Sequence, residues 1–243
     1  MTRILKSLLL VALGLYLYTR LTTGVIEFYI HPRFISLVLL ASVGLLIVAA
    51  SFFLRQPPDD GHDHDHEGHT HGSLSWLGLF VVAVPVVLGL LVPPQPLGAA
   101  AVGNREVQVG SLNSIAPPRG DDRMGLVAGE RNILDWLTDF QRNPDDTAFN
   151  GMEANLTGFL YRDERFAADE FMLARFVVSC CVADASPIGV IVRTADAAAY
   201  ADDQWLQVKG AFQVGTFINA QMPILMAEEI TPIEQPKQPY LYP

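Results

Sequence analysis

Residues 34–54 read FISLVLLASVGLLIVAASFFL and contain no charged side chain. An α-helix rises about 1.5 Å per residue, so a stretch of this length can cross a hydrocarbon core of roughly 30 Å. Residues 74–92 are equally free of charge and predict a further span. Residues 4–23 are strongly apolar, and Arg20 near their end can extend its side chain to the membrane surface. The sequence therefore predicts three transmembrane helices.

The first apolar stretch has a second interpretation, because a cleaved signal peptide also begins with basic residues before an apolar run. Arg3 and Lys6 occupy that position. The residues LYLYTR at 15–20, however, are not the small residues that a signal cleavage site needs. A retained helix is therefore expected.

Three spans would place the N- and C-terminal parts of the chain on opposite sides of the membrane. Basic residues precede the first span, flank the first connection and follow the second span. Because cytoplasmic loops are enriched in Lys and Arg, a cytoplasmic N-terminus and an extracytoplasmic C-terminal domain are favoured, with the reverse left open. The chain is expected to be a multi-pass protein of the cell membrane, in contact with the lipid bilayer.

Charge divides the chain into two parts. The net charge is −10, and residues 104–243 hold eleven Lys and Arg against twenty Asp and Glu. Nucleic acid binding needs a basic face, so this balance argues against nucleic acid as a partner. The predicted organisation is a transmembrane region at 1–98, a linker rich in Ala, Gly, Pro and Ser at 99–129, and a soluble domain at 130–243.

Apolar periodicity predicts a mainly-β soluble domain with one preceding helix at 132–140. Strands are expected at 152–161, 170–182, 188–194, 204–212 and 222–233. Five short strands, with a small helix or turn between the third and the fourth, are typical of a small closed barrel of the OB type. The sequence has no nucleotide fingerprint, nucleophile elbow or phosphate loop, and residues 104–243 contain no histidine to serve as a catalytic base. A non-enzymatic role is expected.

A polar loop at 56–73, between the second and third predicted spans, holds most of the histidines of the chain. They are His62, His64, His66, His69 and His71, interleaved with Asp63, Asp65 and Glu67. Imidazole nitrogens bind zinc, copper and nickel, and carboxylates can add further ligands. So polar a tract cannot bury a core, and it predicts a flexible chelator of a divalent transition metal such as zinc. The alternative is a solvated acidic linker.

The two cysteines of the chain are adjacent, at Cys180 and Cys181, and Asp184 follows them. Adjacent residues cannot make an ordinary disulfide, because their Cα atoms are only about 3.8 Å apart. They can form a strained eight-membered ring, bind a soft metal with Asp184 as a further ligand, or act as a thiol pair. Strand alternation predicts that one side chain points into the domain and the other outwards. A structural interpretation, one cysteine buried and the other at the rim, stays open beside a thiol site.

Several stretches resemble one known family. They are YIHPR at 29–33, RFVVSCCVADASPIGV at 175–190, QWLQVKG at 204–210 and PYLYP at 239–243. Over nearly its whole length the chain resembles the YcgQ-type family of bacterial two-component permease subunits. Members of that family are paired with a separate polytopic permease, which implies an accessory role in a membrane complex. The histidine loop is not carried over as a family feature.

These observations favour an accessory subunit of a two-component membrane permease that handles metal ions or a related solute. One alternative is a stand-alone membrane-anchored metal-binding or thiol-redox protein, which requires Cys180 and Cys181 for activity. Another is a structural membrane anchor used for protein–protein contact, which would keep its function without the cysteines and the histidine loop.

Overall fold

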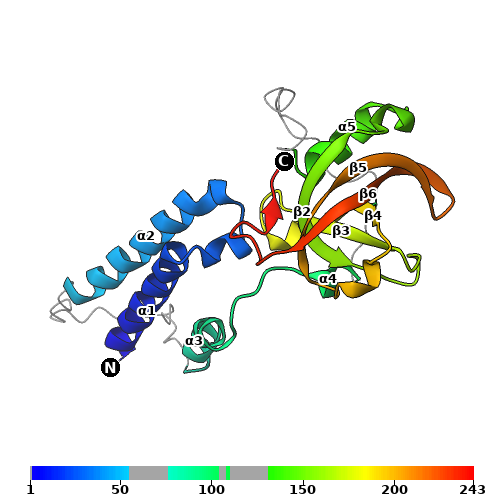
Figure 1. The fold of residues 1–243 in the computed structure, drawn as a ribbon. Helices are drawn as coiled ribbons and strands as arrows, with labels where there is room; N and C mark the ends of the chain where they lie inside the picture. Colours follow the sequence, from blue (N-terminus) through cyan, green and yellow to red (C-terminus); the bar gives the residue numbers. More distant parts are fainter. Residues whose placement is uncertain (1, 55–75, 104–107, 110–130) are drawn as a thin grey trace, which may run out of the picture. The chain divides into compact units, whose positions relative to one another are not determined.

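The computed structural model describes residues 2–54, 76–103, 108–109 and 131–243. Contacts within the chain define two compact units, Met1–Gln95 and Pro96–Pro243. The described part of the first unit is helical, and the second is built mainly of β-strands (Figure 1).

Three long helices make up most of the described part of the first unit. They are α1 (Thr2–Thr22), α2 (Ile35–Leu54) and α3 (Trp76–Leu91). Within the described residues, two helices are long and apolar enough to cross a membrane, over Ile4–Thr22 and Pro32–Phe52. The described part of α3 has 16 residues, fewer than the roughly 20 that a crossing needs. The third predicted span therefore stays a prediction.

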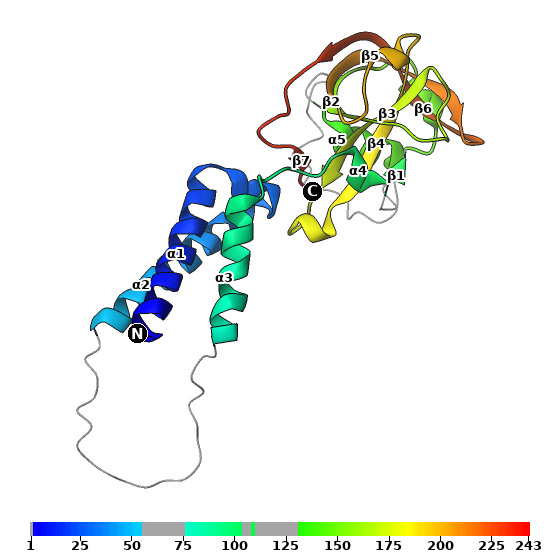
Figure 2. The same ribbon diagram turned by 90° about the horizontal axis from the view of Figure 1, so that it is seen from below.

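Helices α1 and α2 pack against each other along their length (Figure 2). The Ser7 hydroxyl donates to the Ala49 carbonyl at 3.0 Å, and the Ser42 hydroxyl donates to the Gly14 carbonyl at 2.8 Å. The start of α1 therefore faces the end of α2, and the two helices are antiparallel. Small residues let helix backbones approach closely. At Gly14 a Cβ atom would already meet the Leu46 side chain at 3.0 Å.

Helix α3 also lies against α1 (Figure 2). The Arg20 guanidinium donates to the Gly89 carbonyl of α3 and stacks over the Tyr16 ring, 4.9 Å from its centroid. Gly89 is small enough to admit the Tyr16 hydroxyl, which would overlap a Cβ atom at that position. Arg20, in the last turn of α1, thus contacts a neighbouring helix.

A seven-stranded sheet forms the centre of the second unit. Its strands are β1 (Gln108–Val109), β2 (Glu153–Tyr161), β3 (Glu170–Val177), β4 (Ser186–Arg193), β5 (Trp205–Phe217), β6 (Ala220–Pro232) and β7 (Tyr240–Leu241). Strand β2 pairs with β3 and β5, β3 also pairs with β4, and β6 pairs with β4 and β5. Among these pairings β4–β6 is parallel and the others are antiparallel. The short strands β1 and β7 add in parallel to β4 and β3.

The predicted mainly-β domain, its preceding helix and its five strands are confirmed, with two differences in strand length. Strand β3 ends at Val177, five residues earlier than predicted, because the N–H groups of Ser179 and Cys180 donate to the Asp184 side chain and not to a neighbouring strand. Strands β5 and β6 extend further than predicted and meet at a tight turn. Its two central residues, Ile218 and Asn219, both have positive φ, at 46° and 64°.

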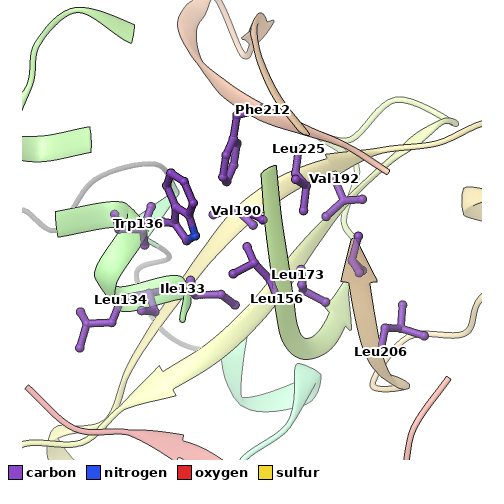
Figure 3. Packing of buried hydrophobic residues seen from close by; sticks show 14 of the residues in the cluster. Ile133, Leu134, Trp136, Leu156, Leu173, Val190, Val192, Leu206, Phe212 and Leu225 are labelled. Carbon is purple, nitrogen blue, oxygen red and sulfur yellow. The ribbon is translucent and has the colours of Figure 1, made fainter. Parts of the chain in front are cut away.

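One face of the sheet packs against α5 (Ile133–Arg142) (Figure 3). The Asn132 side chain caps this helix by accepting the N–H groups of Leu134 and Asp135. Trp136 is fully buried, and its ring lies 4.8 Å from that of Phe212 on β5. The amphipathic helix thus supplies one side of the main core.

The opposite face of the sheet has a second buried cluster. Phe159 and Phe176 stack there with their centroids 5.7 Å apart, and Val102 of the short helix α4 (Ala99–Val102) packs with them. The Leu97 N–H donates to the Tyr240 hydroxyl at 2.9 Å. The chain segment around α4 and strand β7 therefore cover a face that would otherwise expose aromatic rings.

Candidate functional site

The loop that follows β3 holds both cysteines. Cys180 and Cys181 lie between Val177 and the short 3-10 helix Val182–Asp184, which leads into β4. The prediction that strand alternation separates their side chains is wrong, because the strand ends before it reaches them. Their Sγ atoms lie 3.5 Å apart. Cys180 is exposed and Cys181 is half-buried, so the structure does not agree with the alternative interpretation in which one cysteine is buried.

The Asp184 carboxylate holds this loop in place. Its Oδ1 atom accepts the Ser179 N–H at 3.1 Å, and its Oδ2 atom accepts the Cys180 N–H at 2.7 Å. The Asp184 N–H in turn donates to the Cys181 carbonyl at 3.0 Å. Aspartate side chains that bond neighbouring N–H groups stabilise turns in this way. One side chain therefore fixes the backbone on which both thiols stand.

The same carboxylate controls the ionisation of Cys180. A hydrogen bond from the thiol to Asp184 is the main reason that the pKa of Cys180 is raised to about 11. Partial burial acts to raise the pKa of Asp184, but hydrogen bonds from the Cys180 thiol and the loop N–H groups outweigh it and lower that pKa. Cys180 is therefore a neutral thiol at pH 7, which is not the form of an activated nucleophile.

The predicted site residues fall into two groups, the loop histidines as metal ligands and the cluster of Cys180, Cys181 and Asp184 as a second candidate site. Asp184 directs both of its carboxylate oxygens at the loop around Cys180. Among the described residues, no group of three or more His, Cys, Asp and Glu side chains could hold a metal ion. The loop histidines His62, His64, His66, His69 and His71 lie outside the described residues. A metal site there stays a prediction.

Arg175 on β3 is a residue whose role the sequence did not indicate. Its Nε donates to the Pro239 carbonyl at 2.9 Å, and Nη2 donates to the Gln238 carbonyl at 2.7 Å. Its guanidinium also lies 5.3 Å from the ring centroid of Trp205. Burial lowers the pKa of Arg175 to about 10, so the side chain stays charged at pH 7. Arg175 ties the segment before β7 to the strand that leads to the cysteines.

A basic residue in an otherwise apolar strand was the available signal for this role. Residues 171–178 read FMLARFVV. An arginine that is only 8% exposed in such a strand must find several acceptors, since a buried charge without partners is costly. Its two shortest hydrogen bonds go to carbonyls more than 60 residues away, which no local pattern identifies.

Family models cover most of the chain. Residues 117–243 match the DUF1980 C-terminal domain, and residues 5–108 match the DUF1980 N-terminal domain. The chain belongs to the DUF1980 family. The N-terminal match covers α2, α3 and most of α1, and the C-terminal match covers α5 and the strands from β2 to β7, so each match falls largely within one of the two compact units.

Two bacterial proteins are similar in sequence to the DUF1980 chain. A Streptococcus mutans protein named "Putative two-component membrane permease complex subunit" is 22% identical over 200 residues, which cover 67% of this chain and 72% of that protein. The Bacillus subtilis "UPF0703 protein YcgQ" is 24% identical over 96 residues, 39% of this chain and 34% of that protein. The resemblance to the YcgQ-type family is confirmed. No solved structure is significantly similar.

Membrane association follows from two of these observations together. The DUF1980 chain has two helices long and apolar enough to cross a bilayer, and the Streptococcus relative is named as a subunit of a membrane permease complex. Both of these helices belong to the helical unit, whereas the Cys180–Cys181 loop belongs to the mainly-β unit.

Proposed function

We propose that this chain is an accessory subunit of a two-component membrane permease complex. The observation that carries the proposal is the 200-residue similarity to the Streptococcus protein, which extends over 72% of that protein's length. A match of this extent includes more than a shared membrane anchor, because it exceeds the length of the helical unit. No catalytic role is proposed for either unit.

The helical unit is proposed to anchor the subunit as a multi-pass protein with three spans. Large apolar side chains on α1 and α2 are exposed, among them Leu8, Leu15, Leu37, Leu40 and Ile47. Such surfaces are stable in lipid or against the helices of another membrane protein. The contact of Arg20 with α3 supports a third span beside the first. A cytoplasmic N-terminus and an extracytoplasmic β unit complete the proposed topology.

The β unit is proposed to act as a small OB-like barrel that docks on the permease or presents solute to it. The pairings β2–β3, β3–β4, β4–β6, β6–β5 and β5–β2 connect five strands in a circuit, which supports this proposal. The parallel pairing of β6, the last long strand, with β4 completes this circuit.

Metal ions are the proposed solute class, through the histidine loop at 56–73. Its five imidazoles and interleaved carboxylates suit a zinc-like divalent ion. In this role the loop would deliver or sense the ion at the permease, while the β unit makes the protein contact.

Co-purification tests the proposal. The tagged full-length chain is isolated from its native membrane in mild detergent, and the eluate is analysed by mass spectrometry and by elemental analysis. We expect one polytopic membrane protein in an amount comparable to the chain, with bound zinc or a similar metal. The matched control replaces all five loop histidines with asparagine, which should keep the partner and lose the metal.

Each arm of this experiment can fail separately. Recovery of the chain without a polytopic partner, together with unchanged transport after its deletion, would contradict the permease role. A partner that co-purifies with no metal in the wild type would leave the complex standing and remove the metal proposal.

Topology can be tested with the native thiols. Cys180 and Cys181 are the two cysteines of the chain, and neither is buried. A membrane-impermeant maleimide added to intact cells should therefore label the chain if the β unit is extracytoplasmic. Labelling that appears only after the cells are opened would reverse the proposed orientation.

A further inference from the structure

We propose that Cys180 and Cys181 form a thiol–disulfide exchange site, whose oxidised product is the disulfide between these two adjacent residues. The small disulfide of a glutathione-like molecule is the class of oxidant that it takes. This inference goes beyond the permease role and does not depend on it.

The first support is the position of the two sulfur atoms. Side chains of consecutive residues in extended backbone point in opposite directions, yet here the Sγ atoms lie 3.5 Å apart. A disulfide bond is about 2.05 Å long, so the atoms must approach by roughly 1.5 Å to form one. Rotation of the exposed Cys180 side chain can supply much of that movement.

The second support is how the loop is built. Asp184 accepts the N–H groups of Ser179 and Cys180, so the backbone beneath the thiols is held by a residue that does not take part in the bond. The Cys181 carbonyl is held by the Asp184 N–H. The fold therefore keeps both thiols on a fixed loop, with Cys180 exposed and Cys181 half-buried, where a small disulfide can reach them.

The reaction proceeds by two exchanges. A thiolate of Cys181 attacks one sulfur of oxidised glutathione, whose disulfide breaks, so that a mixed disulfide forms and one glutathione thiolate leaves. The Cys180 thiol then loses its proton, and its sulfur attacks the Cys181 sulfur, displaces the second glutathione as a thiolate and closes the ring. Two protein thiols become one disulfide, the oxidant becomes two glutathione molecules, and the two thiol protons end on glutathione. Cys181 attacks first because the Cys180 thiol is the donor in the 3.5 Å contact between the two sulfurs, which leaves the Cys181 sulfur as the acceptor.

Ring strain determines how this site behaves. Adjacent Cα atoms are about 3.8 Å apart, below the usual range of about 4.4–6.8 Å for a disulfide. Strained disulfides have more oxidising potentials and are the labile ones. The product should therefore be reduced again by a modest excess of glutathione, as expected for a reversible site.

The experiment follows one tryptic peptide. Full-length chain in detergent is incubated with oxidised glutathione, quenched with iodoacetamide and digested, and the peptide at 176–193 is analysed by mass spectrometry. It contains both cysteines and no internal Lys or Arg. We expect a product that lacks two hydrogen atoms and carries no label. Cys180→Ser should stop at the mixed disulfide, whereas Cys181→Ser lacks the first nucleophile and should form the mixed disulfide much more slowly.

A synthetic peptide of residues 176–193 is the matched reference for the contribution of the fold. Pre-positioned groups react faster than free ones, so ring closure in the folded chain should be at least about tenfold faster than in the peptide. Equal rates would overturn the proposal that the fold builds the site. Persistent mixed disulfide, doubly labelled peptide or only intermolecular disulfides in the folded wild type would overturn ring formation itself.

Discussion

Arg175 is the residue on which the C-terminal edge of the β unit depends. Its guanidinium donates to backbone carbonyls at Gln238 and Pro239, which a lysine cannot bond together because it lacks the planar fork. We expect Arg175→Lys to lower the free energy of unfolding by about 2 kcal/mol, since hydrogen bonds to charged groups contribute about 1.5–3 kcal/mol each. Urea denaturation followed by tryptophan fluorescence measures this change.

Arg165→Lys is the matched control for this substitution. Arg165 forms an ion pair with Asp163 at 2.5 Å, but its side chain is 44% exposed. Exposed ion pairs contribute about 0–1 kcal/mol, so this variant should unfold close to wild type. Equal changes in the free energy of unfolding for the two variants would show that the hydrogen bonds of Arg175 contribute no more than an exposed ion pair.

Asp184 should suppress the reactivity of Cys180. Its carboxylate accepts a hydrogen bond from the thiol and raises the pKa of Cys180. Removing the negative charge should therefore lower that pKa and increase the thiolate fraction of Cys180 at pH 7. In a Cys181→Ser background, we expect Asp184→Asn to accelerate alkylation of Cys180 by iodoacetamide about tenfold, because part of the gain is offset by lower thiolate nucleophilicity. The rate should rise with pH in both proteins.

The same substitution in a Cys180→Ser background is the control, and it separates local unfolding from ionisation. A loop that merely opens would expose both cysteines alike. An equal acceleration at Cys181 would therefore contradict the assigned role of Asp184.

At the residue scale, sequence identified the cysteines and Asp184 as a cluster but not their arrangement. Spacing alone brings Asp184 near Cys180. The proximity of the two sulfurs depends on where β3 ends, and the N–H of Val178 finds its partner at Leu241. That contact joins residues far apart in the chain, so no local pattern contains it.

At the element scale, the α1–α2 pair provides a sharp test of close packing. A Cβ atom at Gly14 would lie 3.0 Å from Leu46, whereas one at Gly44 would meet nothing within 4 Å. Gly14→Leu should therefore destabilise the helical unit by about 1–3 kcal/mol, the usual range for overpacking. Gly44→Leu, with the same added side chain, should have little effect. Thermal unfolding in detergent by circular dichroism distinguishes them, and equal losses would contradict this packing.

The turn between β5 and β6 should be more stable with a different residue at Ile218. A β-branched residue at positive φ is strained, and Ile218 has a φ of 46° with its side chain exposed. We expect Ile218→Gly to raise the free energy of unfolding by about 1 kcal/mol, which is a rise of a few degrees in Tm. A lower Tm would show that the isoleucine side chain contributes contacts that outweigh its backbone strain.

The elements themselves were largely predictable because their signals are local. Helix α5 has apolar residues at helical spacing behind an Asn cap, and the long strands have apolar residues bounded by turn residues. What sequence missed are elements defined by their partners. Strand β7 has two residues, and the segment at Leu97 is fixed by the Tyr240 hydroxyl. Such short segments have no period of their own.

At the scale of the whole molecule, each unit should keep its fold when separated. The β unit has buried clusters on both faces of its sheet, and these involve residues after Pro96. We expect residues 96–243 to be soluble and to unfold in one cooperative transition, because domains with their own core fold alone. Circular dichroism and the dispersion of amide NMR signals measure this. A fragment with strand content but no cooperative transition would show that the membrane unit is required.

The parallel pairing of β4 with β6 has a consequence for motion within the β unit. It consists of Val192 with Leu225 and Arg193 with Met226, whereas β5 and β6 pair over nearly their full length. Local opening follows the weakest contacts, so deuterium should enter amides along this seam before those of the long hairpin. The β4–β6 edge of the circuit of strands would then open first, and the residues inside the circuit would become exposed to water there before anywhere else.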